Sequence, residues 1–185
     1  MSWKHRVGFV AASAVRLWAR GDRAPERRLT PTEIELLRPI YAEAIDYRRV
    51  RIRAPVQGLL GISRRAFVIE DTLFVPAEFL PLQPEVLVHE ACHLWQHQHG
   101  GHAYIADSIH AQLVGDGYRL AKGLGEGRRW DQLNCEQQAT LLEEGWTQGA
   151  LRGNRLILAG VDRTANFEAA LGEVRAGRGA HFDQG

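Results

Sequence analysis

Hydrophobic residues recur at helical spacing after residue 30, where the chain also carries a helix-start signal. Thr30 can cap the free amide groups of a helix, Pro31 suits the first helical position, and Glu33 can reach back to the Thr30 amide. We therefore expect a helix that begins at Pro31 and buries one face. The apolar positions of that face are Ile34, Leu37, Ile40, Tyr41 and Ala44.

The pattern changes to strand-like alternation further along the chain. Apolar and basic residues alternate from residue 49 to residue 53, which predicts a half-exposed strand that ends at Pro55. Two apolar runs, 67–69 and 73–75, are separated by three polar residues, so we expect a hairpin over residues 66–75. We expect the second run to be an edge strand that can pair with an extended peptide.

Helical patterns dominate the rest of the chain. Gly100-Gly101 supplies a stop for one of these helices, and Asn134 is a candidate N-cap for another. An apolar run from Val7 to Val15 resembles a short export signal, but two arginines soon interrupt the region, which favours a packed N-terminal helix. The other expected helices cover residues 84–98, 103–122, about 135–150 and 166–175.

Length and composition agree with one globular unit of the α+β class, mostly helical with a small antiparallel or mixed sheet. The chain has 185 residues, 45% of them hydrophobic, and no stretch approaches the ~20 apolar residues that a membrane span needs. We expect an N-terminal helix or extension over 1–28, a central domain over 29–150, and a C-terminal helix with a flexible tail over 151–185. Cys92 and Cys135 are too few for a disulfide scaffold, so a reducing, cytoplasmic location is expected.

The formal net charge of +1 conceals an uneven distribution. Residues 1–65 carry 14 basic and 6 acidic groups, whereas residues 66–185 carry 9 and 16. Of the 23 basic residues 21 are arginine, which favours bidentate partners such as carboxylates or phosphates. Because these arginines are spread out and lack interleaved aromatic residues, we expect them to dock onto the acidic half of the chain rather than to bind nucleic acid.

Five of the eight histidines lie between residues 89 and 102, and two of them form the pattern His89-Glu90-Ala91-Cys92-His93. Residues four apart on a helix face the same way, so His89 and His93 can present ring nitrogens to one zinc ion (Zn2+). Glu90 lies beside them, where its carboxylate could take a proton from water activated by the metal. The pattern therefore predicts a zinc site with Glu90 as the catalytic base.

Zinc needs a third protein ligand, for which the sequence offers several candidates. Glu136 is favoured because it lies on the first turn of a separate helix and can approach the ion from another direction. Glu143 and Glu144 on the same helix are alternatives. His99 stands at the position of the third histidine in an HExxHxxGxxH pattern, but Gln96 replaces the glycine that lets the chain turn there.

Four blocks of sequence, in this order, resemble a known family. The chain is similar to the bacterial Vgr-related proteins, which are zincin-like domains similar to the HExxH core domains associated with contractile-injection systems. The resemblance implies a minimal zincin-like (gluzincin-like) fold in which His89, His93 and Glu136 bind zinc and Glu90 is the catalytic base. The blocks are Leu29-Thr30-Pro31 with Glu33, Ala44 to Arg51, Val88 to Gln98, and Glu136 to Ala139.

These observations predict a zinc-dependent, metallopeptidase-like hydrolase that acts on an unidentified peptide or protein. No motif marks a residue that would stabilise the oxyanion, for which Tyr104, His110 and Tyr118 are candidates. The alternative is a catalytically inactive, metal-stabilised binding or assembly module linked to a secretion or phage-tail-like apparatus. In that case contractile-injection or secretion machinery is the expected partner, and export by such a system is the expected route.

Overall fold

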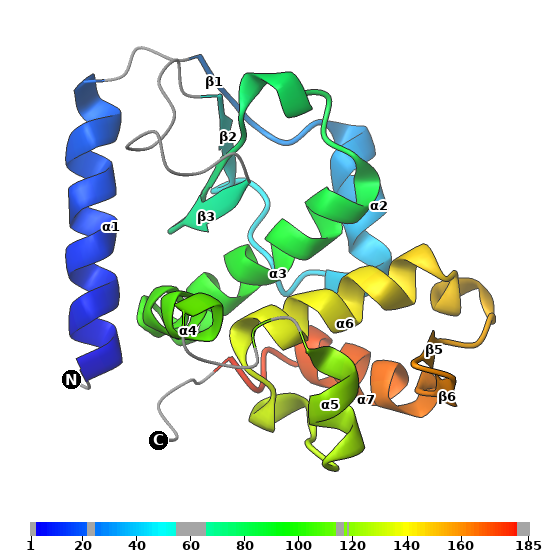
Figure 1. Ribbon diagram of the computed structural model, residues 1–185. Coiled ribbons are helices and arrows are strands. Elements are labelled where there is room, and N and C mark those ends of the chain that lie inside the picture. The colour runs from blue at the N-terminus through cyan, green and yellow to red at the C-terminus, as the bar shows by residue number, and fades with distance from the viewer. Residues whose placement is uncertain (1–2, 22–24, 55–65, 114–116, 118, 181–185) are drawn as a thin grey trace.

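One long helix, α3 (Pro84–Gly100), runs through the middle of the molecule (Figure 1). It packs most extensively against α6 (Cys135–Thr147), and its middle residues Leu94 and Trp95 are completely buried. This pair of helices forms the frame on which the candidate site is built. The computed structural model describes residues 3–21, 25–54, 66–113, 117 and 119–180.

Helix α2 (Pro31–Tyr41) begins with the predicted capping box. The Glu33 amide donates to Thr30 Oγ1 at 3.2 Å, and the Thr30 amide donates to Glu33 Oε2 at 2.8 Å. Its apolar face packs on α3 and α7 (Thr164–Arg175), with Leu37, Ile40 and Tyr41 fully buried. The start and the buried face predicted for this helix are confirmed, although the helix ends before Ala44.

The two helices that carry the candidate ligands also begin where the sequence indicates. Pro84 occupies the first turn of α3, and Gly101 ends that helix with a φ of 69°. At the start of α6 the Gln137 amide donates to Asn134 Oδ1 at 2.8 Å, and the Asn134 amide donates to Gln137 Oε1 at 3.2 Å. Local hydrogen bonds of this kind satisfy the free backbone groups at a helix end and so determine where the helix begins.

The single helix expected over residues 103–122 is wrong. The structure has two helices there, α4 (Ala103–Leu113) and α5 (Leu120–Gly125). Gly117 lies between them with a φ of 42°, a left-handed backbone conformation that an α-helix does not contain. This glycine conformation interrupts the single helix that was expected.

A small mixed sheet packs on α3, as the α+β class predicts. Its strands are β1 (Glu26–Arg27), β2 (Arg51–Arg53), β3 (Phe67–Ile69) and β4 (Thr72–Phe74), in the order β1-β2-β4-β3. The β3–β4 hairpin is antiparallel, as predicted, whereas β2 and β4 are parallel.

The expectation that segment 73–75 forms an edge strand is wrong. Strand β4 lies between β2 and β3, and the Val75 amide donates to the Arg53 carbonyl at 2.9 Å. These pairings occupy the backbone groups that an added peptide strand would need. A substrate therefore cannot pair with this strand without displacing a neighbour.

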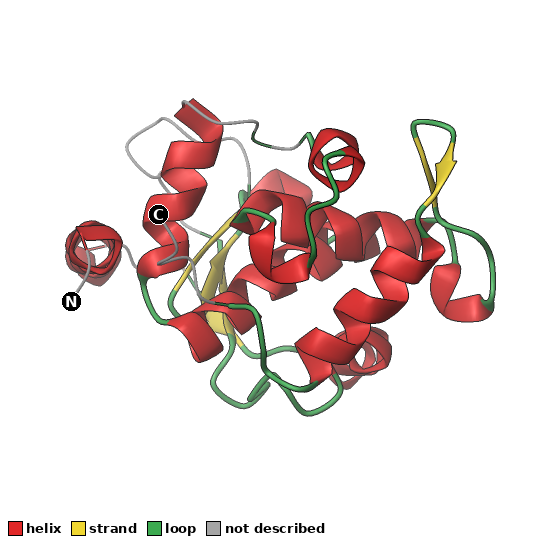
Figure 2. Cartoon of the chain, turned by 90° about the horizontal axis from the view of Figure 1, so that it is seen from below, coloured by secondary structure: helices red, strands yellow, loops and turns green. Residues whose placement is uncertain are grey.

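The two ends of the described chain add elements that flank this core. Helix α1 (Trp3–Gly21) packs along α4, so closely that a Cβ built at Gly8 would lie 1.9 Å from the His102 carbonyl oxygen. A hairpin of β5 (Ile157–Leu158) and β6 (Val161–Asp162), which is not predicted from the sequence, projects from the other side (Figure 2).

Within the described ranges, no helix has the length and hydropathy needed to cross a bilayer. The remaining short turns are the 3-10 helices η2 (Ala77–Phe79), η3 (Trp130–Gln132) and η4 (Ala150–Arg152).

The ion pairs of the basic N-terminal region are mostly local. Arg27 pairs with Glu33, Arg38 with Glu43, and Arg48 with Asp46, all within the first 65 residues. Contacts with the acidic part of the chain come from Arg49, which pairs with Asp71 at 2.6 Å, and from Lys4, which pairs with Asp107 at 3.5 Å. The expected docking of the basic region onto the acidic half is seen in these two contacts.

Helix α7 holds α6 in place through a close contact between Gly145 and the buried Phe167. A Cβ built at Gly145 would lie 2.2 Å from the Phe167 ring, whereas a Cβ at Gly172 in α7 would meet no atom within 4 Å. Both positions are inside helices, so alanine offers each the same gain in helix propensity of about 1 kcal/mol.

The Gly145→Ala variant should therefore be less stable than the wild type by about 1–3 kcal/mol, because the added methyl group overpacks the contact with Phe167. The matched Gly172→Ala variant should be more stable by about 0.5–1 kcal/mol. Urea unfolding followed by circular dichroism measures both. Equal effects of the two substitutions would contradict the packing described here.

Candidate metal centre

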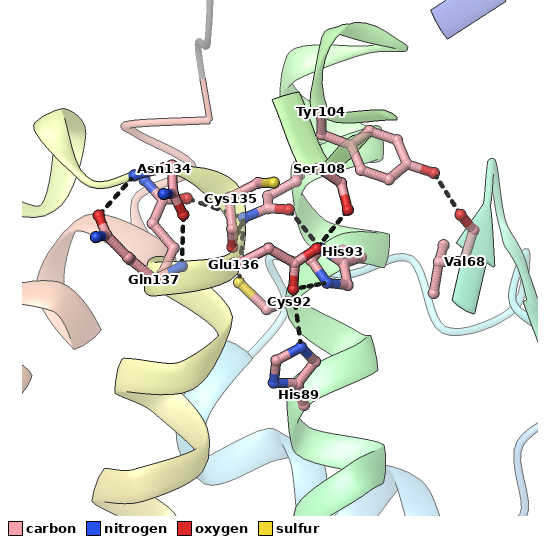
Figure 3. Close-up of polar contacts among 12 residues, drawn as sticks. Val68, His89, Cys92, His93, Tyr104, Ser108, Asn134, Cys135, Glu136 and Gln137 are labelled. Atoms are coloured by element: carbon pink, nitrogen blue, oxygen red, sulfur yellow. Dashed lines mark hydrogen bonds and ion pairs between the residues drawn. The ribbon is translucent and has the colours of Figure 1, made fainter. Parts of the chain in front are cut away.

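Helices α3 and α6 bring three candidate metal ligands together. His89 and His93 lie one turn apart on α3, and Glu136 projects toward them from the first turn of α6 (Figure 3). One ligand atom from each lies within 4.8 Å of the other two. The three residues expected from the sequence as ligands therefore lie close together in space, although Glu136 is more than 40 residues from both histidines in the sequence.

The spacing of the ligand atoms suits a tetrahedral ion. Glu136 Oε2 lies 3.5 Å from His89 Nε2 and 3.7 Å from His93 Nε2. Two ligands at ~2.1 Å from a tetrahedral ion are roughly 3.4 Å apart, which is close to both values. Two imidazoles and one carboxylate also form a common donor set for a divalent transition metal. The residues present thus fit such an ion.

A carboxylate on α6 orients His89. His89 Nδ1 lies 2.9 Å from Glu143 Oε2, so the ring donates its Nδ1 proton to this carboxylate and presents Nε2 to Glu136. Contacts of this kind fix the tautomer and raise the basicity of a metal-binding histidine. Glu143, which the sequence analysis considered as a ligand, is placed behind His89 instead.

A buried amide orients His93 in the same way. Gln96, which is completely buried, donates through Nε2 to the Cys135 carbonyl and to Gln138 Oε1, both at 3.0 Å. Its Oε1 is thereby directed to His93 Nδ1 at 2.8 Å, which leaves Nε2 facing Glu136. The residue that replaces the glycine of the longer histidine pattern therefore ties both ligand helices together.

Helix α4 supports the third ligand. Ser108 donates a hydrogen bond to Glu136 Oε1, and Asp107 accepts one from the Cys135 amide at 2.9 Å. These contacts fix the first turn of α6, from which Glu136 projects. Neither residue is predicted from the sequence, because a serine and an aspartate within a helix resemble ordinary polar positions.

The site has the electrostatic character of a cation site. Burial lowers the pKa of His89, but its hydrogen bonds to Glu136 and Glu143 outweigh this and raise it to about 10. Burial raises the pKa of Glu136, but the charge of nearby His93 and the hydrogen bond with His89 outweigh this, so the net shift is strongly downward. The carboxylates therefore stabilise positive charge between the rings, and a metal ion that binds there must displace protons.

Glu90 lies beside this cluster without the hydrogen bonds that its neighbours make. It is 7% exposed, and its Oε2 atom is buried with no hydrogen-bond partner in the described part of the chain. Burial raises its pKa, and the nearby His93 and His89 lower it, with a net upward shift. A buried carboxylate oxygen with a free lone pair and a raised pKa is suited to accept a proton from a bound molecule.

The remaining ligand candidates point elsewhere. His99 Nε2 lies 2.7 Å from the Ala44 carbonyl oxygen, and its ring packs on Trp95. Glu144 accepts a hydrogen bond from Gln148, one turn along α6. The structure therefore does not bring His99 or Glu144 into the cluster.

The oxyanion candidates have other environments. The buried Tyr104 hydroxyl donates to the Val68 carbonyl oxygen at 3.1 Å, and its ring stacks on His93 (Figure 3). His110 is exposed, and Tyr118 lies outside the described residues. Cys92 and Cys135 are fully buried, and burial raises the pKa of both thiols, which disfavours thiolate chemistry.

Comparison with known proteins finds one informative sequence relation. The chain is 31% identical over 135 residues to the type VI secretion system spike protein VgrG2b of Pseudomonas aeruginosa. The alignment covers 66% of this chain but only 13% of VgrG2b, so the chain spans a small part of that protein's length. This similarity supports the Vgr-related resemblance.

The chain was also compared with protein-family models and with solved structures. No family model matches the chain. The structure of the effector domain of Pseudomonas aeruginosa VgrG2b aligns with 94% of this chain and 97% of that domain, at 21% identity and a TM-score of 0.46.

Removal of the carboxylate behind His89 should weaken metal binding. We expect Glu143→Ala to raise the dissociation constant for zinc about 10- to 100-fold, because the ring loses the acceptor that holds its tautomer. Glu144→Ala on the next residue of α6 is the matched control and should leave the constant unchanged. Titration against a chelating indicator measures both, and equal constants for the two variants would show that Glu143 does not orient the ligand.

The stability of the metal-free protein should depend on pH through His89. Because its pKa rises from 6.5 to about 10 on folding, the stabilisation is complete below pH 6.5 and is lost as the pH rises through 10. The melting temperature of chelator-treated protein should therefore fall over this window, and less steeply in His89→Gln. The exposed His110→Gln is the control, and a slope in His89→Gln equal to that of the wild type would refute this role.

Proposed function

We propose that the chain is a zinc-dependent hydrolase of peptide bonds that belongs to a secretion-associated protein. The observation that carries this proposal is the juxtaposition of the His89, His93 and Glu136 cluster with the buried, unpaired Oε2 of Glu90. A purely structural metal site has no need of such a carboxylate, and an unpaired buried oxygen costs folding free energy. The sequence similarity to a type VI secretion spike protein supports the association with secretion.

The residues divide the chemistry between them. A zinc ion held by His89, His93 and Glu136 would supply Lewis acidity, which makes water more acidic and a carbonyl more electrophilic. Glu90 accepts the proton from the attacking water at Oε2 and returns it to the leaving amine. Its raised pKa suits both steps, since the group must hold the proton and then release it.

Hydrogen bonds from neighbouring side chains keep the three ligand residues in the protonation states that metal binding requires. Glu143 and Gln96 accept the Nδ1 protons of His89 and His93, so both Nε2 lone pairs face the ion. Ser108 donates to the outer oxygen of Glu136, which leaves its other oxygen for the metal. The supporting side chains come from three helices: Gln96 from α3, Ser108 from α4 and Glu143 from α6.

A second candidate is a catalytically inactive, metal-stabilised module of a secretion apparatus. It is favoured by the similarity to a spike protein and by the Tyr104 hydroxyl, which donates to the Val68 carbonyl oxygen and not to the cluster. In this case zinc would bind and stabilise the fold, but no peptide would be cleaved. The two candidates therefore differ in the role of Glu90 alone.

Substitution of Glu90 by glutamine tests the hydrolase proposal. The variant should retain stoichiometric zinc and its melting temperature, and should lose about 10²- to 10⁴-fold in rate, because the amide cannot accept the proton. Glu85→Gln, on the first turn of the same helix, is the control and should keep full activity. Mass spectrometry of a digested peptide library measures cleavage; cleavage that persists in Glu90→Gln, or none in the zinc-loaded wild type, would refute the proposal.

A further inference from the structure

A pocket of about 460 Å³ opens directly beside the candidate catalytic residue. His89 and Glu90 form part of its wall, so the pocket is continuous with the metal cluster. Its volume lies in the range of sites that hold small ligands, and it is much larger than the volume of one water molecule. A molecule that reacts at Glu90 therefore has room to place part of itself in this pocket.

Another part of the pocket lining is apolar and partly exposed. The segment of residues 79–82, together with Ala66 and Val86, lines it. Phe79 and Leu80 are 48% and 36% exposed, which is high for large apolar side chains and costs free energy in water. An apolar group that enters the pocket would remove this surface from water.

The charged groups of the pocket restrict its occupant further. Glu78 and Glu143 line it with Glu90, and no lysine or arginine occurs among the described residues that line it. The Glu143 carboxylate is engaged by His89, whereas Glu78 belongs to the same turn as Phe79. An acidic side chain would meet like charge there, and like charges at short range disfavour binding.

We propose that this pocket binds an uncharged apolar side chain, of the size of leucine or phenylalanine, in the residue next to the bond that is cleaved. The inference rests on the proposed function, because only a peptide bond that is cleaved at Glu90 lies next to the pocket. It makes Phe79 and Leu80 specificity-determining residues. It also excludes aspartate and glutamate at that position of the substrate.

Binding tests this inference separately from catalysis. Zinc-loaded Glu90→Gln protein is titrated with blocked peptides of the form Ala-Ala-X-Ala, in which X is leucine, phenylalanine, alanine, lysine or aspartate, and affinity is measured by NMR shifts. Leucine and phenylalanine should bind about 10- to 100-fold more tightly than alanine, as expected for burial of one apolar side chain, and aspartate should bind most weakly. Equal affinities, or tightest binding of lysine or aspartate, would overturn the inference.

Variants of the pocket wall locate the preference. In the double variant Phe79→Ser/Leu80→Ser the ratio of leucine to alanine affinities should fall close to 1. In the matched double variant Ile157→Ser/Val161→Ser, which removes similarly exposed side chains from the β5–β6 hairpin, the ratio should be unchanged. A ratio that survives the first substitution would overturn the inference, whereas wild-type protein that binds these peptides but does not cleave them would refute the hydrolase proposal alone.

Discussion

A single buried carboxylate, that of Glu136, joins the two halves of the candidate site. It is 2% exposed and lies between two histidine rings of another helix. Buried charge of this kind is costly unless it is compensated, and here the compensation comes from the rings, from Ser108 and from the start of α6. The packing of α3 on α6 therefore determines both the stability of this charge and the geometry of any ion held there.

The surrounding structure can be understood as support for that contact. Gln96 and Glu143 link each histidine to α6, while Asp107 on α4 ties down the first turn of that helix. Helix α7 presses on α6 at Gly145, where only a glycine leaves room for Phe167. These contacts involve the four helices α3, α4, α6 and α7, and together they hold the ligands at the spacing that a tetrahedral ion requires.

The parts of this site that could be predicted from the sequence depend on local geometry. The spacing of His89 and His93 places both rings on one helix face, and the caps at Thr30 and Asn134 mark where helices begin. The support residues could not be found in this way, because the contacts of Ser108 and Gln96 with α6 form only when distant helices pack. The edge-strand prediction failed for the same reason, since the parallel pairing of β2 with β4 joins segments separated by about 20 residues and leaves no local signal.

We propose that the junction of α3 and α6 holds a metal ion through His89, His93 and Glu136. Anomalous X-ray diffraction from crystals of the zinc-loaded protein, recorded on both sides of the zinc absorption edge, tests it most directly. One anomalous peak is expected, at ~2.1 Å from His89 Nε2, His93 Nε2 and one carboxylate oxygen of Glu136. A peak that instead lies at His99 or Glu144, or no peak between α3 and α6, would contradict it.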